Sequence, residues 1–228
     1  MMIIYGKQLF LYILRNYPQK LIKVQLSKKC EQKLFSQIKR VCSDVALVDN
    51  KKAQALSRGG NHQGFIAEIS DLEFVEFSDV KSSNFLLILQ GITDVGNIGA
   101  IVRSAYAFGV DAIVVSGIKS LNLEAIIRTS SGAVFDMPIV LEPNSYDLIN
   151  ELKQVGFRLY GADMNGKNIK DIKFHSKIAL MMGSESSGIP NKLKGKLDEI
   201  VSIKMAREFD SLNVSAAAAV LCDRIFNG

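Results

Sequence analysis

Short runs of continuous apolar residues in the second half of the chain restrict the fold more than any other feature. The candidate strands are the segments 85–92, 112–117, 137–140, 157–163, 177–183 and 199–205. A strand with one solvated face alternates apolar and polar residues, whereas a run without alternation suits a parallel sheet covered on both faces. Helical patterns separate most of these runs, as at 145–156 and 211–226. This half of the chain therefore predicts an α/β domain with a parallel sheet.

The first part of the chain repeats the alternation on a smaller scale. Helical patterns lie at 6–16, 30–40 and 50–59, and strand patterns lie at 20–27, 44–49 and 64–69. The segment 70–84 has weak periodicity and several turn-forming residues. We therefore expect a small α/β domain at 1–72, a linker at 73–83 and a second domain at 84–228.

Composition and charge narrow the class of protein. With 48% hydrophobic and 22% charged residues, a net charge of +5 and a pI near 9.0, the chain suits a globular protein with an anionic partner such as RNA. The apolar N-terminus, 1–20, is interrupted by polar residues and predicts an amphipathic helix rather than a leader. Because no apolar stretch reaches roughly 18 residues, we expect a cytoplasmic protein with no membrane partner.

Three cysteines without C-x-x-C spacing and only two histidines predict reduced thiols and no metal.

Three of the predicted strands run into polar loops that are followed by helical patterns. These segments are "ITDVGNIGAIVRSAYAFG" at 92–109, "IALMMGSESSGIP" at 178–190 and "VSIKMAREFDSLNVSAAAAV" at 201–220. The carboxyl ends of parallel strands lie at the same edge of a sheet, which is where ligands bind in such folds. We therefore expect the three loops to meet and to form a ligand site.

The first of these loops does not fit the known phosphate-binding loops. A dinucleotide fingerprint needs G-x-G-x-x-G, whereas Gly96 and Gly99 give only G-x-x-G. Gly91 and Gly96 have the spacing of a P-loop, but Asn97 stands where the phosphate-binding lysine is required. A nicotinamide-dependent oxidoreductase and a nucleotide triphosphatase are therefore disfavoured. A purely structural role remains open, in which the glycines allow a tight turn and Arg103 pairs with a surface carboxylate.

Taken together, the three segments resemble the motifs of the SpoU (TrmH-like) branch of the SPOUT methyltransferases. "NIGAIVRSAYAFG" is similar to the first motif, "MMGSESSGI" to the second and "SLNVSAAAAV" to the third, in the same order. The N-terminal part, with "NHQGFIAEI", resembles the ribosomal-protein-L30-like RNA-binding domain of the branch that acts on 23S rRNA. The resemblance implies a SPOUT-type parallel sheet with a C-terminal trefoil knot, a small N-terminal L30-like α/β domain, and a homodimer.

The resemblance also implies an activity and a set of site residues. The activity is 2′-O-methylation of an RNA ribose with S-adenosylmethionine as donor and without a metal. A guanosine of 23S rRNA is the expected substrate, and DNA is not expected as a partner. The residues implied to bind the donor are Gly183, Ile203, Met205 and Leu212. The residues implied to act in catalysis are Arg103, Asn97, Glu185, Ser211 and Asn213.

Chemistry restricts the role of Arg103, because a guanidinium is always protonated and makes a poor general base. We expect Arg103 to bind a phosphate, place the ribose and stabilise the developing alkoxide, with Glu185 as a group that could orient it. A helix cap is the alternative role for Asn97.

The sequence departs from the family pattern at one place, where Lys204 replaces the proline of an I-P-M segment. Proline fixes φ, so its absence predicts a less constrained loop beside the donor. Two alternative functions remain. A tRNA methyltransferase is disfavoured by the N-terminal domain, and an inactive RNA-binding assembly factor is disfavoured by the retained motif residues.

Overall fold

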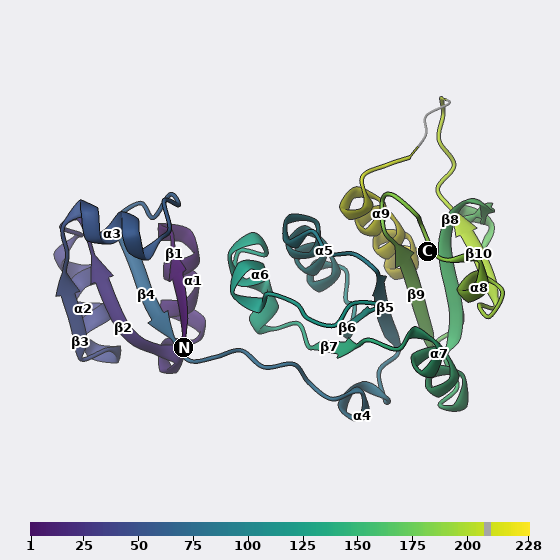
Figure 1. The fold of residues 1–228 in the computed structure, drawn as a ribbon, viewed down its shortest axis with the longest axis horizontal. Coiled ribbons are helices and arrows are strands. Elements are labelled where there is room, and N and C mark those ends of the chain that lie inside the picture. Colours follow the sequence, from purple (N-terminus) through teal and green to yellow (C-terminus); the bar gives the residue numbers. More distant parts are fainter. Residues whose placement is uncertain (208–210) are drawn as a thin grey trace. The chain divides into compact units, whose positions relative to one another are not determined.

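The computed structural model describes residues 1–207 and 211–228 of the protein. Contacts divide these residues into two compact units, which we describe separately (Figure 1). Unit 1 contains Met1–Glu73 and Leu123–Gly132, and unit 2 contains Phe74–Asn122 and Ala133–Gly228. Among the described residues, no helix combines the length and apolar character needed to cross a membrane.

Unit 1 is built on a four-stranded sheet with the order β1-β4-β2-β3. The strands are β1 (Met2–Tyr5), β2 (Leu21–Leu26), β3 (Asp44–Leu47) and β4 (Phe65–Ile69). Strand β4 is antiparallel to β1 and β2, whereas β2 and β3 are parallel. The helices are α1 (Lys7–Asn16), η1 (Pro18–Lys20), α2 (Gln32–Val41), α3 (Asn50–Leu56) and α6 (Leu123–Thr129). The alternation predicted for this part is confirmed, but β1 and α6 were not predicted.

Strand β1 corrects the expectation of a helix that begins at the N-terminus. Residues Met2–Tyr5 pair with β4, and the helix α1 begins only at Lys7. Between them Gly6 has a φ of 105°, a backbone conformation that favours glycine and ends the strand. The apolar residues of the strand and of the helix adjoin in sequence, so that the two periodicities merge into one pattern.

Unit 2 contains the parallel sheet predicted from the apolar runs. Its strands have the order β10-β8-β9-β5-β6-β7, and every pair is parallel. They are β5 (Phe85–Gln90), β6 (Ala112–Ser116), β7 (Ile139–Glu142), β8 (Arg158–Asn168), β9 (Ile178–Gly183) and β10 (Glu199–Ser202). All six residues of β5 are buried, which explains the absence of alternation in its sequence. The predicted sheet and its six strands are confirmed.

Helices and short helical turns surround this sheet. They are α4 (Phe77–Val80), α5 (Val95–Ala107), η2 (Ala133–Phe135), α7 (Ser145–Gln154), η3 (Ile169–Asp171), α8 (Asn191–Lys194) and α9 (Val214–Asn227). Helix α4 lies within the segment expected to be a linker, and its Phe77 and Val80 are buried in the core of unit 2. The amide of Val75 also donates a 2.9 Å hydrogen bond to the carbonyl of Ile139. Part of the expected linker is therefore folded against the sheet of unit 2.

The edge strands β8 and β10 pair with a large irregularity. Ile200 lies opposite Gly161, but the next residue, Val201, lies opposite Lys167. Residues 162–166 of β8 therefore have no partner in β10 and form a bulge in the pairing. Gly166 returns so close to β10 that a Cβ on it would lie 2.5 Å from the carbonyl carbon of Val201. Glycine is required there by this close approach of two backbones.

Candidate active site

The three polar loops meet through hydrogen bonds among Asn97, Glu185 and Asn213. The Nδ2 group of Asn213 donates to Oε1 of Glu185 at 2.6 Å and to Oδ1 of Asn97 at 3.0 Å. The Nδ2 group of Asn97 donates to the same Oε1 at 3.4 Å. These residues come from the start of α5, the loop after β9 and the residue that precedes α9. The prediction that the loops lie at one edge of the sheet is confirmed.

Helix caps explain why both asparagine amides are free to reach across the loops. Asp94 caps α5 by accepting from the amide of Asn97 at 2.7 Å, so Asn97 is not the cap. Asn213 caps α9 through Oδ1, which accepts from the amides of Ser215 at 2.9 Å and Ala216 at 3.4 Å. The Oδ1 of Asn213 thus fixes the helix, while its Nδ2 holds the other two loops.

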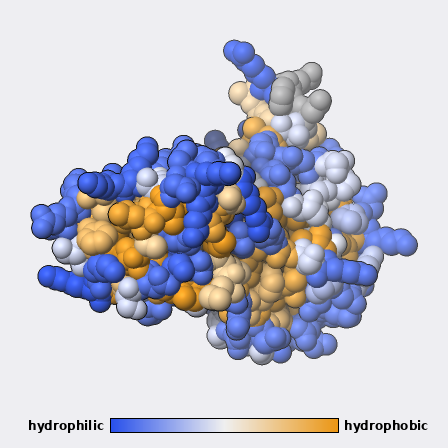
Figure 2. Space-filling model, turned by 60° about the vertical axis from the view of Figure 1, so that its left-hand side comes forward, coloured by the Kyte–Doolittle hydropathy of each residue, from blue (hydrophilic) through white to orange (hydrophobic). Residues whose placement is uncertain are grey.

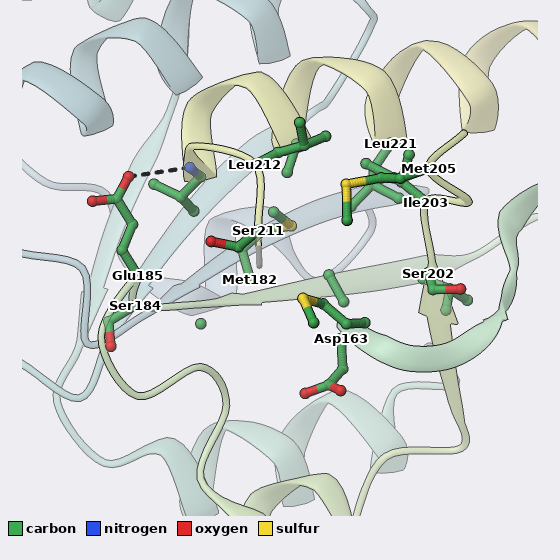
Figure 3. Close-up of a pocket in the computed structure, with 16 residues that line it drawn as sticks. Asp163, Met182, Ser184, Glu185, Ser202, Ile203, Met205, Ser211, Leu212 and Leu221 are labelled. Atoms are coloured by element: carbon green, nitrogen blue, oxygen red, sulfur yellow. Dashed lines mark hydrogen bonds between the residues drawn. The ribbon is translucent and has the colours of Figure 1, made fainter. Parts of the chain in front are cut away.

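Glu185 accepts all its recorded hydrogen bonds through one oxygen. Besides the two asparagines, the amide of Val214 donates to Oε1 at 3.3 Å (Figure 3). Val214 is the first residue of α9, where the partial positive charge of a helix end favours a carboxylate. Glu185 therefore holds Asn97 and the start of α9, rather than Arg103 as the sequence suggested.

Arg103 lies on α5 and is exposed. Within residues 1–207 and 211–228, its guanidinium forms no hydrogen bond and no ion pair, and Arg103 does not line the neighbouring pocket. The surface carboxylate partner that remained open at the sequence level is thus absent from the described part of the chain. A free guanidinium can bind an external phosphate through two parallel hydrogen bonds.

A pocket opens beside this junction at the carboxyl ends of β9 and β10 and next to the middle of β8. Its lining consists of Ala162, Asp163, Met164, Met182, Gly183, Ser184, Glu185, Val201, Ser202, Ile203, Met205, Ser211, Leu212, Val214, Ala217 and Leu221. All four residues expected to bind the donor, together with Ser211 and Glu185, belong to this set. Figure 3 shows the apolar side chains of Ile203, Met205 and Leu212 close to α9, to which Leu221 belongs.

The chemistry of the lining suits a ligand with a flat apolar part and polar groups. Methionine, isoleucine and leucine side chains contribute to the lining, as do the hydroxyl group of Ser211 and the carboxylate of Glu185, both exposed residues. Apolar pockets with a few convergent polar groups are typical of small-molecule and cofactor sites. Cys222 takes no part as a nucleophile, because burial raises the pKa of its thiol to about 12.

One wall of the pocket was not predicted from the sequence. Ala162, Asp163 and Met164 belong to the part of β8 that bulges away from its pairing with β10, and Asp163 forms an ion pair with Lys194 of α8. The hydrogen bond from Lys194 lowers the pKa of Asp163, whose carboxylate points away from α9 (Figure 3). The dipeptide Asn165-Gly166 is a turn signal that could have indicated this interruption.

Position 183 requires glycine because of the loop that follows it. Ser184 and Gly188 form an isolated bridge, which folds the loop back over the end of β9. A Cβ on Gly183 would overlap the backbone atoms of Gly188 and Ile189, and neither can move aside as a flexible side chain would. The glycine thus allows the second motif loop to close beside the pocket.

Comparison with known proteins identifies the class that this fold and site define. Residues 84–223 match the SpoU rRNA Methylase family, and residues 3–75 match a domain described as RNA 2'-O ribose methyltransferase substrate binding. The expected enzyme class, an RNA (ribose-2′-O)-methyltransferase, is thereby confirmed. The chain belongs to the SpoU rRNA methylase family, as its motifs indicated.

Individual relatives agree with this assignment. A Haemophilus ducreyi protein named 23S rRNA (guanosine-2'-O-)-methyltransferase RlmB is 35% identical, covering 95% of this chain and 94% of the relative. The protein of the same name from Yersinia pestis is 30% identical, covering 96% and 94%. Among solved structures, an AdoMet-bound rRNA methyltransferase from Sinorhizobium meliloti has a TM-score of 0.81 at 23% identity, covering 98% of this chain and 85% of that one. AviRb from Streptomyces viridochromogenes has the same TM-score at 20% identity, covering 99% and 88%.

Proposed function

We propose that this protein transfers a methyl group from S-adenosylmethionine to the ribose 2′-hydroxyl of a guanosine in 23S rRNA. The observation that carries the proposal is the pocket lined by Gly183, Ile203, Met205 and Leu212 beside the junction of the three motif loops. The printed names of the two RlmB relatives support the choice of 23S rRNA and of guanosine.

The pocket residues fit the methyl donor by their chemistry. Apolar walls from Ile203, Met205 and Leu212 suit the adenine ring, and Gly183 also lines the pocket. S-adenosylmethionine supplies a methyl group that its sulfonium centre already activates. The protein therefore needs to align the ribose hydroxyl and to assist the loss of its proton, and we propose that it does so without a metal.

We assign catalysis to Arg103, Asn97, Glu185, Ser211 and Asn213. Arg103 binds a phosphate of the RNA, holds the ribose in place and stabilises the alkoxide that develops at the 2′-oxygen. Glu185 and the two asparagines act as positioning residues, because their hydrogen bonds fix the loops on which the reaction depends. Ser211, in the lining of the pocket, is suited to contact the ribose, and the proton leaves to a phosphate or to water.

We also propose the larger arrangement that the family resemblance implies. It comprises a substrate-binding domain at 1–72, a linker at 73–83 whose Phe77 and Val80 pack in the core of unit 2, and a methyltransferase domain at 84–228. The C-terminal part of the methyltransferase domain forms a trefoil knot, and the active enzyme is a cytoplasmic homodimer. Size-exclusion chromatography with light scattering tests the dimer, and a monomer with full activity contradicts it.

Mapping of ribose methylation tests the proposed substrate. The purified protein is incubated with S-adenosylmethionine and transcripts of 23S rRNA or tRNA, and the methylated positions are mapped. We expect methylation at a guanosine of the 23S transcript. Methylation of tRNA alone supports the alternative substrate. Binding of the donor without methylation of either RNA supports an inactive RNA-binding factor instead.

A further inference from the structure

A cationic groove lies between helices α1 and α2 of unit 1, and none of the residues assigned to catalysis lines it. It is lined by Lys7, Leu11, Leu14, Arg15, Glu31, Lys33, Leu34, Gln37, Arg40 and Val41. Leucine and valine side chains from both helices form its apolar part, and four cations surround them with one carboxylate, that of Glu31. Figure 2 shows apolar areas (orange) between hydrophilic side chains (blue) on the face of the molecule that it presents.

The four cations are available to an external partner. Lys7, Arg15, Lys33 and Arg40 are all exposed, and none forms an ion pair within the described residues. A surface that served only solubility would mix both signs of charge, whereas this groove carries mainly one. The excess of unpaired cations points to an anionic partner.

The position of two of these lysines does not serve the stability of their helices. Lys7 is the first residue of α1 and Lys33 is the second residue of α2, and neither helix has an acidic residue in its first turn. A cation near the amino end of a helix opposes the helix dipole and is mildly unfavourable. Arg15 and Arg40, in contrast, lie in the last turns, where a cation is favourable.

We propose that the groove between α1 and α2 binds the phosphate backbone of the substrate RNA, an inference that rests on the proposed function. Arg15 lies eight positions after Lys7, about 12 Å along a helix, and Arg40 lies seven positions after Lys33, about 10 Å. Each helix therefore holds its two cations far enough apart to contact different phosphates of one strand. The planar guanidinium groups of the two arginines match phosphate oxygens. An acidic peptide is less suited, because cations on both helices flank the groove as they would flank a strand of phosphates.

Paired neutralisation of the lysines provides the test, with a matched control on α3. K7Q/K33Q removes two first-turn lysines from the groove, and K51Q/K52Q removes two first-turn lysines of α3 that do not line it. Affinity for a 23S rRNA transcript is measured at several salt concentrations. We expect K7Q/K33Q to bind about tenfold more weakly and its salt slope to fall by about 0.7 to 0.9 for each phosphate that is no longer neutralised. The control should stay within about twofold of the unmodified protein.

Further measurements distinguish a failure of the groove proposal from a failure of the proposed methyltransferase function. K7Q/K33Q should melt at the same or a slightly higher temperature than the unmodified protein, bind S-adenosylmethionine normally, and raise KM for RNA while leaving kcat at saturating RNA unchanged. If the unmodified protein methylates RNA but K7Q/K33Q and R15Q/R40Q both bind the transcript normally, the groove proposal is overturned and an acidic protein becomes the better partner. If the unmodified protein neither binds the donor nor methylates RNA, the proposed function itself fails.

Discussion

Asn213 connects the second motif loop to the start of α9. Its Nδ2 group donates a 2.6 Å hydrogen bond to Oε1 of Glu185, and its Oδ1 caps α9. One side chain thus anchors the last helix and fixes the second motif loop. A replacement can preserve the first role and destroy the second, which makes the two separable by mutation.

Replacement of Asn213 tests this dual role. N213A removes the cap and the link to Glu185, and we expect the free energy of unfolding to fall by about 1–2 kcal/mol. N213D keeps an oxygen that can cap α9 but places a carboxylate beside Oε1 of Glu185. It should retain more stability than N213A and still lose methyl transfer. Urea unfolding and a methylation assay measure the two effects, and normal activity in N213D contradicts the positioning role.

Replacement of Arg103 separates catalysis from folding and donor binding. Because Arg103 is exposed and without a partner in the described ranges, R103A should change the free energy of unfolding by less than about 0.5 kcal/mol. Methyl transfer at saturating RNA should fall by about 10²-fold or more. R103K should recover little activity, since lysine lacks the planar fork. The control K192A removes an exposed cation of α8, and loss of activity in both variants would indicate a general effect of charge.

Leu212 is expected to form an apolar wall of the donor site. L212R brings a large charged group into the pocket and should weaken binding of S-adenosylmethionine at least about tenfold, whereas L212M should be tolerated. Leu212 is 39% exposed, so F35R, at a residue with a similar exposure of 37% in α2, is a matched control. Calorimetry measures the affinity of each variant for S-adenosylmethionine. Unchanged affinity in L212R means that the donor binds elsewhere.

The two glycines Gly183 and Gly195 should respond oppositely to alanine. In G183A the new Cβ would overlap the backbone of Gly188 and Ile189, so we expect a loss of several kcal/mol in stability or a loop that no longer closes. In G195A the nearest atom lies 3.8 Å away and φ is −65°, so alanine should be neutral or stabilise by about 0.5 kcal/mol. Thermal unfolding and donor binding are measured for both. Equal stability of the two variants would show that the backbone at Gly183 yields easily.

The pair of Asp163 and Lys194 should make stability depend on acid pH. Lys194 lowers the pKa of Asp163 below its ordinary value of 3.8, so the folded state binds this proton less readily than the unfolded state does. The contribution is present above pH 3.8 and disappears as the pH falls through the lower pKa of the folded protein. D163N should therefore cost about 1 kcal/mol at pH 7 and much less at an acid pH below the lowered pKa of Asp163. D171N, at an exposed carboxylate nearby, is the control, and an equal loss for D163N at both pH values argues against the pair.

The sheet of unit 2 was predictable because burial on both faces leaves a direct trace in the sequence. The six residues of β5 are all buried and all but the last are apolar, so no competing pattern arises. Strand β1 was missed because its apolar residues adjoin those of α1, and only the conformation of Gly6 separates them. Helix α4 was missed because four residues are too few for a helical period to appear.

The site was predictable where it depends on short motifs and not where it depends on long-range pairing. The four expected donor-binding residues line one pocket because each lies at or just after the end of a strand, or just before a helix. The wall at Ala162, Asp163 and Met164 depends on how β8 pairs with β10, a register that no local pattern specifies. The sequence predicted that Arg103 lies on a helix. It did not predict that Arg103 has no partner within the described residues, because that depends on which carboxylates lie near it in the fold.

The hydrogen bond between Asn97 and Asn213 spans 116 positions of the chain, which has a consequence for the order of folding. Contacts between residues so far apart in sequence form slowly, because a long loop must close before they gain any energy. Strands β5 and β6 can pair early, since α5 connects them directly. The junction of the three loops, in contrast, is incomplete until α9 has docked. A folding intermediate can therefore contain the central sheet and most of the buried core while it has no capacity for methyl transfer.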